Sequence, residues 1–187
     1  MFDLDRFTAD CRAARAADRS SKTICEVVKR AVSDPMGLLK PLGEPHRAGI
    51  KEIYRSADLS ILSVVWAPGM MIMPHNHRMW AVIGVYCGRE DNILWRRIAE
   101  TGEGQLEAAG ARSLAVKDVQ PFGDDIIHSV INPTSKFTAA LHVYGGDFFD
   151  AHRSEWDSDT LSEHPFDGNR ARQIFEEANR HYVAGLT

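Results

Sequence analysis

The sequence predicts a mainly β protein whose core is a sandwich or a barrel. Short segments rich in β-branched and aromatic residues recur along the chain, and Gly, Pro, Asp or Asn separate them. They lie near 48–55, 58–67, 80–87, 91–98, 111–118, 125–131 and 137–145. Their number and even spacing favour a sandwich or a barrel over alternating βα units.

Helices are expected on both sides of this core. Residues 3–17 and 20–33 carry apolar side chains at helical spacing, and Ser20 and Ser21 supply a cap between the two helices. The helical pattern then breaks, and the chain enters the β region, along a run of Pro and Gly: Pro35, Gly37, Pro41, Gly43 and Pro45. A last helix, at about 168–183, is expected to close over the barrel or its edge.

Length and composition predict one ordinary globular domain. A chain of 187 residues is long enough for one well-cored domain and too short for two comfortable ones. We expect a helical N-terminal extension over 1–45, the β core over 46–148, and a C-terminal extension with a helix over 149–187. With 26% charged residues, a net charge of -4 and no basic run, nucleic acid is not an expected partner.

The sequence also carries expectations about location and redox state. The first six residues lack a basic region followed by an apolar segment, and no apolar run is long enough to span a bilayer. Cys11, Cys25 and Cys87 are an odd number without paired spacing, which is typical of reduced thiols. We therefore expect a cytoplasmic protein with no membrane partner, either a monomer or a homodimer.

Two histidine segments carry the candidate chemistry. His75 and His77 are two residues apart, and side chains alternate along a strand, so both imidazoles can reach one metal ion. About fifty residues downstream, His128 lies in a second segment that runs from Pro121 to Asn132.

These two segments resemble the two sequence motifs of the cupin family. The residues at matching places are Gly69, His75, His77 and Gly88 in the first motif and Gly123, His128 and Asn132 in the second. The gap between Gly123 and His128 is longer than usual, and Ala81 stands where the family usually has Glu. The resemblance implies a double-stranded β-helix, or jelly-roll barrel, with two N-terminal helices and a C-terminal helix. It also implies a metal held by three histidines without a carboxylate.

The missing carboxylate has a chemical consequence. Three neutral imidazoles leave the full double charge of a divalent cation to be balanced by anionic ligands from outside, and a thiolate fits well. Three ligands on one face also leave open positions for substrate and dioxygen, as in non-haem iron(II) oxygenases. The expected cofactor is Fe(II), although nickel, zinc and manganese also accept imidazole.

Among cupins, the pattern resembles the thiol dioxygenases, and most of all bacterial cysteine or 3-mercaptopropionate dioxygenases. Residues 75–84 are similar to their His-Asp-His-x-x-Trp-Gly-x-Ile-Gly, and Trp66 precedes the first histidine by the usual distance. Residues 141–144 are similar to their late strand, where a Ser, a His and a Tyr alternate along the cavity. The likeness covers about residues 50–148 and implies oxidation of a small thiol to a sulfinate with O2.

The resemblance assigns catalytic roles to His142 and Tyr144, which share a face of one strand and would hydrogen-bond the bound oxygen or the substrate. Ordinary core packing is the alternative for both side chains. The serine of that strand is replaced by Ala140. Because Ala81 also takes the place of the cysteine that animal enzymes join covalently to the tyrosine, no such crosslink is expected.

Substrate-binding residues are also predicted from the resemblance. Arg55, after Tyr54, is the candidate for holding a substrate carboxylate, although its spacing is off by one, which on a strand reverses the face. Arg89 and Arg97, on a neighbouring strand, are its rivals. The ring of Trp80 is expected to pack beneath the site and contact the substrate.

Two other functions fit the same residues. One is a three-histidine cupin that cleaves carbon–carbon bonds in diketones or aromatic diols, and the loss of the serine at Ala140 keeps this interpretation open. The other is a non-catalytic cupin that binds a metal or senses a small molecule. Asp124 and Asp125 either orient a histidine or cap a turn.

Overall fold

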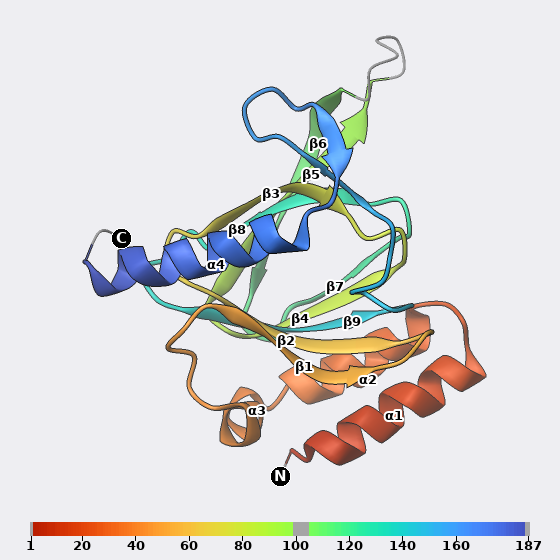
Figure 1. Ribbon diagram of the computed structural model, residues 1–187. Coiled ribbons are helices and arrows are strands. Elements are labelled where there is room, and N and C mark those ends of the chain that lie inside the picture. Colours follow the sequence, from red (N-terminus) through yellow and green to blue (C-terminus); the bar gives the residue numbers. More distant parts are fainter. Residues whose placement is uncertain (1, 99–104, 186–187) are drawn as a thin grey trace.

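Two antiparallel β-sheets face each other in the computed structural model, which describes residues 2–98 and 105–185 (Figure 1). The strands of the first sheet are, in spatial order, β1 (Gly49–Arg55), β2 (Ser60–Trp66), β9 (Thr138–Tyr144), β4 (Ala81–Cys87) and β7 (Val119–Phe122). Those of the second are β11 (Glu163–Pro165), β10 (Ser154–Trp156), β3 (Met71–Asn76), β8 (Ile127–Ile131), β5 (Arg89–Arg97) and β6 (Leu106–Ala115). The mainly β fold predicted from the sequence, with double-stranded β-helix architecture, is therefore present.

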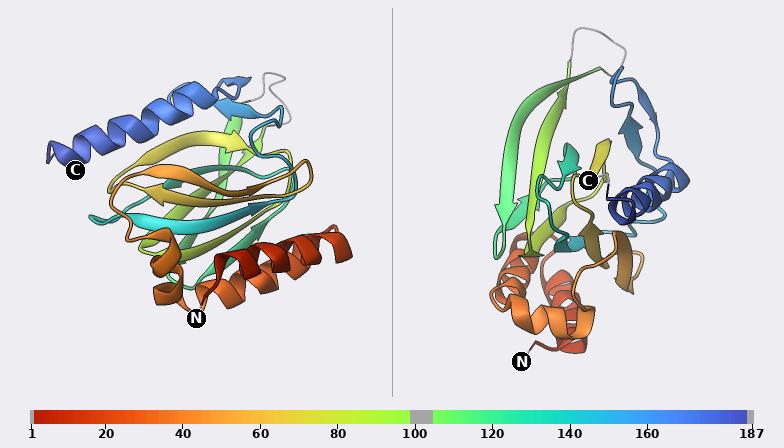
Figure 2. Two further views of the ribbon diagram at one scale, coloured as in Figure 1. Left: turned by 60° about the horizontal axis from the view of Figure 1, so that its bottom comes forward. Right: turned by 90° about the vertical axis from the view of Figure 1, so that its left-hand side faces the viewer.

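Four helices are found in the described part of the chain: α1 (Leu4–Ala17), α2 (Lys22–Val32), α3 (Pro35–Leu42) and α4 (Gly168–Val183). The first three gather on the outer face of the first sheet, whereas α4 lies on another side of the molecule (Figure 2). No helix in the described residues is long and apolar enough to cross a membrane.

The prediction that the chain leaves its helical pattern at Pro35 was wrong, because α3 begins at that residue. Pro35 occupies the first turn, where its missing N–H costs no hydrogen bond, and the side chain of Asp34 caps the helix by accepting from the backbone N–H of Gly37. Proline therefore starts a helix here. Of the two serines predicted to cap α2, Ser20 accepts from the N–H of Lys22 at 3.3 Å, whereas Ser21 makes no capping side-chain hydrogen bond.

Strand β9 is buried on both faces and divides the interior into two cores. On one face, Leu141 and Val143 pack against the helices α1 to α3. On the other face, Ala140, His142 and Tyr144 point between the two sheets, as alternation along a strand requires. The central place of β9, between β2 and β4, thus carries two polar side chains into the space between the sheets.

The chain passes from one sheet to the other at Gly88, between β4 and β5. Gly88 has a φ of 74°, and a Cβ atom there would lie 2.3 Å from Oγ1 of Thr138 and 2.9 Å from its Cα. The hydroxyl of Thr138 is fixed in this position, because it donates to the carbonyl of Arg89 and accepts from the N–H of the same residue. Only glycine satisfies both the backbone angle and the space.

Gly88→Ala is therefore expected to destabilise the fold more than Gly69→Ala. Gly69 has a similar φ of 67°, and a Cβ atom added there would meet nothing within 4 Å, so alanine costs only the backbone strain, about 1–2 kcal/mol. At Gly88 the steric overlap adds roughly 1–3 kcal/mol. Urea unfolding of the two variants measures the difference, and equal losses would contradict this account of the corner.

Candidate metal centre

Three histidines, from two neighbouring strands and from the residue that follows one of them, converge on one point. His75 of β3 lies directly opposite His128 of β8 in the antiparallel register, and His77 follows two residues after His75. The Nε2 atom of His77 lies 3.3 Å from that of His75 and 3.1 Å from that of His128. All three side chains are buried. Among the described residues, they are the group of possible ligand side chains that lie close enough together to hold one metal ion. No Asp or Glu belongs to this group.

Hydrogen bonds to the outer ring nitrogens set the tautomers of two of these imidazoles. Nδ1 of His75 lies 3.0 Å from the backbone carbonyl of Met73, which can only accept, so this nitrogen carries the hydrogen. Nδ1 of His128 lies 2.7 Å from Oδ1 of Asn92, whose amide nitrogen donates to Glu90. In both rings the inner nitrogen, Nε2, is left with a free lone pair, as metal ligands require.

Burial keeps the imidazoles in their neutral, metal-binding form. Desolvation, helped by a neighbouring arginine and histidine, lowers the pKa of His75 to about 4. Burial and the neighbouring imidazoles lower the pKa of His77 and His128 well below the usual range. Neutral imidazole is the form that ligates a metal.

The spacing of the nitrogens fits a cation. Metal–nitrogen bonds of roughly 2.0–2.1 Å at tetrahedral or octahedral angles separate neighbouring ligand atoms by roughly 2.9–3.4 Å. The two Nε2 separations, 3.1 and 3.3 Å, fall within this range. In the metal-binding tautomers, with Nε2 bare on all three rings, the lone pairs would repel one another at these distances unless a cation lay between them. The residues present therefore fit a divalent metal.

A Tyr–His pair lies beside the three histidines. The hydroxyl of Tyr144 lies 3.0 Å from Nδ1 of His142, and the ring of Tyr144 meets that of His77 edge-on with centroids 5.0 Å apart. Burial raises the pKa of Tyr144 well above its usual value, so the phenol keeps its proton at neutral pH. The structure thus brings together all five residues that the sequence predicted for metal binding and catalysis.

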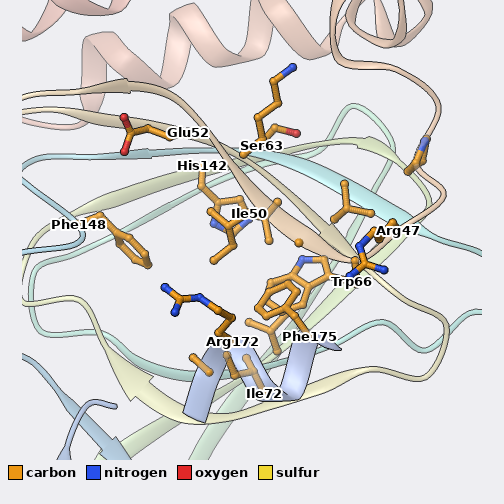
Figure 3. A pocket seen from close by; sticks show the side chains of 18 of the residues that line it. Arg47, Ile50, Glu52, Ser63, Trp66, Ile72, His142, Phe148, Arg172 and Phe175 are labelled. Atoms are coloured by element: carbon orange, nitrogen blue, oxygen red, sulfur yellow. The ribbon is translucent and has the colours of Figure 1, made fainter. Parts of the chain in front are cut away.

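A cavity of about 600 Å³ opens from this centre toward β1 and α4. Trp66 and Phe175 stack on one side of the space, with ring centroids 5.3 Å apart, and Phe148 stands on the other (Figure 3). Phe175 comes from α4, so the expectation that this helix closes over the barrel is met. The walls are mainly apolar, and the lining also includes exposed charged side chains such as Glu52 and Arg172.

Arg153 is a half-buried arginine in the wall of this cavity, and the sequence did not predict it as a site residue. Its guanidinium lies over the rings of Phe148 and Phe166, with Cζ 4.1 and 3.7 Å from their centroids. Its Nη1 is buried and has no hydrogen-bond partner among the described residues. Burial lowers the pKa of Arg153 to about 10, so the side chain remains charged at neutral pH. A cation with a buried, unused donor is a ready partner for an anion.

Arg55, the predicted carboxylate-binding residue, does not line the cavity. A β-bulge between Glu52 and Tyr54 shifts the register, so Arg55 pairs with Ser60 and lies on the same sheet face as Tyr144. At this end of the sheet, however, its Nε donates to the carboxylate of Asp147 at 2.8 Å. The bulge therefore cancels the reversal of face predicted from the spacing, but the ion pair with Asp147 holds the side chain away from the cavity.

The other predicted substrate contacts are also outside the cavity. Trp80 precedes β4 and packs on the helical side of the first sheet, where its Nε1 donates to the carbonyl of Arg19. The physical reason is alternation, because the next residue, Ala81, faces the interior. Arg89 pairs with Asp91 in an ion pair, and Arg97 pairs likewise with Glu163.

The sequence also did not predict Asn92, which binds the outer ring nitrogen of His128. Asp124 and Asp125 lie exposed in a turn, and Asn92 of β5 takes the orienting role considered for them. No local signal marks Asn92, because it meets His128 only through the pairing of β5 with β8.

Comparison with known proteins finds solved structures of similar architecture. No protein-family model matches the sequence. Similar solved structures include a double-stranded β-helix protein from Klebsiella pneumoniae, at 12% identity and a TM-score of 0.46 over 60% of this chain and 81% of that one. A cupin-family protein from Methanocaldococcus jannaschii shows 10% identity and a TM-score of 0.44 over 54% and 81%. An oxalate oxidase in complex with glycolate shows 16% and 0.41 over 55% and 53%.

Similarity at this level assigns neither a family nor an activity. The strand order and the three converging imidazoles define the class: a double-stranded β-helix protein with a candidate three-histidine metal centre.

Metal binding should depend on these residues in a graded way. Loss of a ligand in His75→Ala, His77→Ala or His128→Ala is expected to abolish stoichiometric metal. Asn92→Ala is expected to weaken affinity about 10–100-fold, because His128 loses its orienting partner. His142→Ala, a cavity histidine outside the group, should keep one metal per chain. Chelator competition and metal analysis test the series, and full binding by His128→Ala would rule out this site.

The metal-free protein should lose stability as the pH falls from about 6.5 to about 4. In this window the unfolded chain protonates an imidazole whose pKa is 6.5, whereas folded His75 remains neutral until about 4. The unfolded state binds more protons, so the unfolding free energy falls by about 1.4 kcal/mol per pH unit for this residue. Urea unfolding at several pH values across this range provides the test. The unfolding free energy of His75→Gln should depend less steeply on pH than that of the wild type, and an equal dependence would contradict the assignment.

Proposed function

We propose that this protein is a non-haem iron(II)-dependent dioxygenase that oxidises a small anionic thiol, of the cysteine or 3-mercaptopropionate type, to a sulfinate. The observation that carries the proposal is the presence, in one cavity, of three neutral imidazoles and a charged arginine with an unused donor. Uncharged ligands call for an anionic partner at the metal. The unused donor of the arginine favours a substrate that carries a second anionic group besides the thiolate.

Iron(II) held by His75, His77 and His128 would supply open positions where a thiolate and dioxygen bind side by side. In the overall reaction both oxygen atoms of O2 end on sulfur, which gives up four electrons, so no other reductant is needed. The protein's part is to orient the thiol and to manage its proton.

Arg153 would hold the substrate by its carboxylate. Both terminal nitrogens of a guanidinium can donate to the two oxygens of a carboxylate, and the aromatic rings of Phe148 and Phe166 fix the plane of this one. Such a charge-assisted pair in a mainly apolar cavity orients the molecule as well as binding it. The ring of Tyr144 lies against Phe148, over which the guanidinium stands, and its hydroxyl contacts His142.

The size of the cavity favours a second candidate. About 600 Å³ lies in the range of pockets that hold drug-sized ligands, and a three-carbon thiol would fill a small part of it. The stacked rings of Trp66 and Phe175 would suit a diketone or an aromatic diol. Such compounds are cleaved at a carbon–carbon bond by three-histidine cupins. Arg153 favours the thiol acid, and the two candidates are separated by their products.

Iron-loaded protein is expected to consume O2 and release a sulfinate when given cysteine or 3-mercaptopropionate. Cysteamine, which has no carboxylate, should be a poorer substrate. Arg153→Met should raise KM for 3-mercaptopropionate about 10–100-fold, because a charged hydrogen bond of roughly 1.5–3 kcal/mol is lost, and should change KM for cysteamine little.

Arg55→Met is the matched control, since this arginine pairs with Asp147 outside the cavity and its loss should leave KM unchanged. Oxygen uptake with product analysis measures both variants. Absence of uptake with every thiol, together with cleavage of a diketone or a diol, would replace the thiol reaction by the second candidate.

A further inference from the structure

Glu90 is a fully buried carboxylate between the two sheets. It lies on β5 and has no exposed surface. Oε2 accepts a hydrogen bond from Nε1 of Trp66 at 2.9 Å, and Oε1 accepts one from Nδ2 of Asn92 at 3.0 Å. Oε2 also lies 3.6 Å from Nε2 of His142, which is within ion-pair range although longer than a hydrogen bond. A charge buried this deeply costs free energy unless it is hydrogen-bonded and paired with an opposite charge.

The carboxylate determines which nitrogen of His142 carries the hydrogen. Burial pushes the pKa of Glu90 up, but His142, Asn92 and Trp66 outweigh burial and bring it below the usual value, so the group is ionised at neutral pH. Nε2 of His142 has no hydrogen-bond partner among the described residues and faces this acceptor. An N–H there is attracted, whereas a bare lone pair would be repelled.

The hydrogen on Nε2 leaves Nδ1 of His142 bare. That nitrogen lies 3.0 Å from the hydroxyl of Tyr144, so the phenol donates its hydrogen to the ring. An oxygen lone pair of Tyr144 is then free to accept a proton in the cavity. The order carboxylate, imidazole, hydroxyl is that of the serine hydrolase triad, in which the acid fixes the tautomer and stabilises the imidazolium.

We propose that Glu90, His142 and Tyr144 form a triad that accepts the proton of the substrate thiol, an inference that rests on the proposed function. The S–H bond breaks with its electron pair left on sulfur, and the proton passes to the oxygen of Tyr144. The phenolic proton passes in turn to the lone pair of Nδ1 on His142. A thiolate and an imidazolium result. Glu90 is a positioning residue, and its negative charge, on the opposite sheet, offsets the positive charge of the imidazolium. The serine replaced by Ala140 is not needed for this arrangement.

The tautomer of His142 is measurable without substrate. We suggest nitrogen-15 NMR of the histidine side chains in protein loaded with diamagnetic Zn(II), with His142 assigned by comparison with His142→Gln. The wild type should show a protonated Nε2 and a bare Nδ1. Glu90→Gln should shift the ring toward the opposite tautomer. A wild-type ring with hydrogen on Nδ1 would overturn the proposal, and this measurement needs no variant at position 90.

Glu155→Gln is the matched control. Glu155 is also a buried strand carboxylate, but it accepts from the N–H of Asp167 and from Arg170 and does not contact His142. Its loss should leave the tautomer unchanged. An unchanged tautomer in folded Glu90→Gln would likewise overturn the proposal.

Kinetics of the iron-loaded enzyme complete the test. Glu90→Gln should lower kcat for the thiol about 100-fold, the lower range for general base catalysis, while KM stays within about twofold because Glu90 does not touch the substrate. Rates are divided by bound iron, since Glu90 also orients Asn92 and through it His128. A wild type that oxidises no thiol overturns the proposed function. If the wild type oxidises a thiol and Glu90→Gln keeps the normal tautomer of His142 and a normal kcat, this inference alone is overturned.

Discussion

The convergence of three uncharged imidazole nitrogens in a buried site is the constraint on which the rest of this structure depends. In the metal-binding tautomers Nε2 is bare on all three rings, and lone pairs 3.1 and 3.3 Å apart repel unless a cation lies between them, so the fold must hold the rings in place. It does so through strand register, which sets His75 directly opposite His128. The outer hydrogen bonds from Met73 and Asn92 then fix the ring orientations.

Glu90 links the metal centre to the Tyr–His pair. One oxygen reaches His128 through Asn92, and the other faces His142, so a single carboxylate sets the protonation of a ligand and of a candidate proton acceptor. Burying this charge costs several kcal/mol, which the donors Trp66 and Asn92 offset in part. A polar network of this kind is stable only when its members are paired. Within the described residues, the buried side-chain nitrogens left without a hydrogen bond belong to His77, His142 and Arg153, which all line the cavity.

The C-terminal segment contributes a strand and cavity-lining side chains to the site, in addition to the helix α4. β10 joins the second sheet beside β3, where Glu155 pairs with His75 in register. Arg153 immediately precedes this strand and reaches the cavity, and Phe175 of α4 stacks on Trp66 of the opposite sheet. The cavity is therefore built from both sheets and from the chain that follows them.

The sequence by itself determined the elements whose signal is local. Alternation along strands and helical stripes marked most of the β core and α4, and the two-residue spacing of His75 and His77 placed both rings on one face. Tertiary structure alone decided the contacts across the sheets. Arg55 faces the interior through a bulge yet is held by Asp147, and the cavity is lined by Arg153 instead. The partners of Glu90 lie on other strands or the same strand face, so their meeting depends on register and sheet packing, which neighbouring residues in the sequence do not encode.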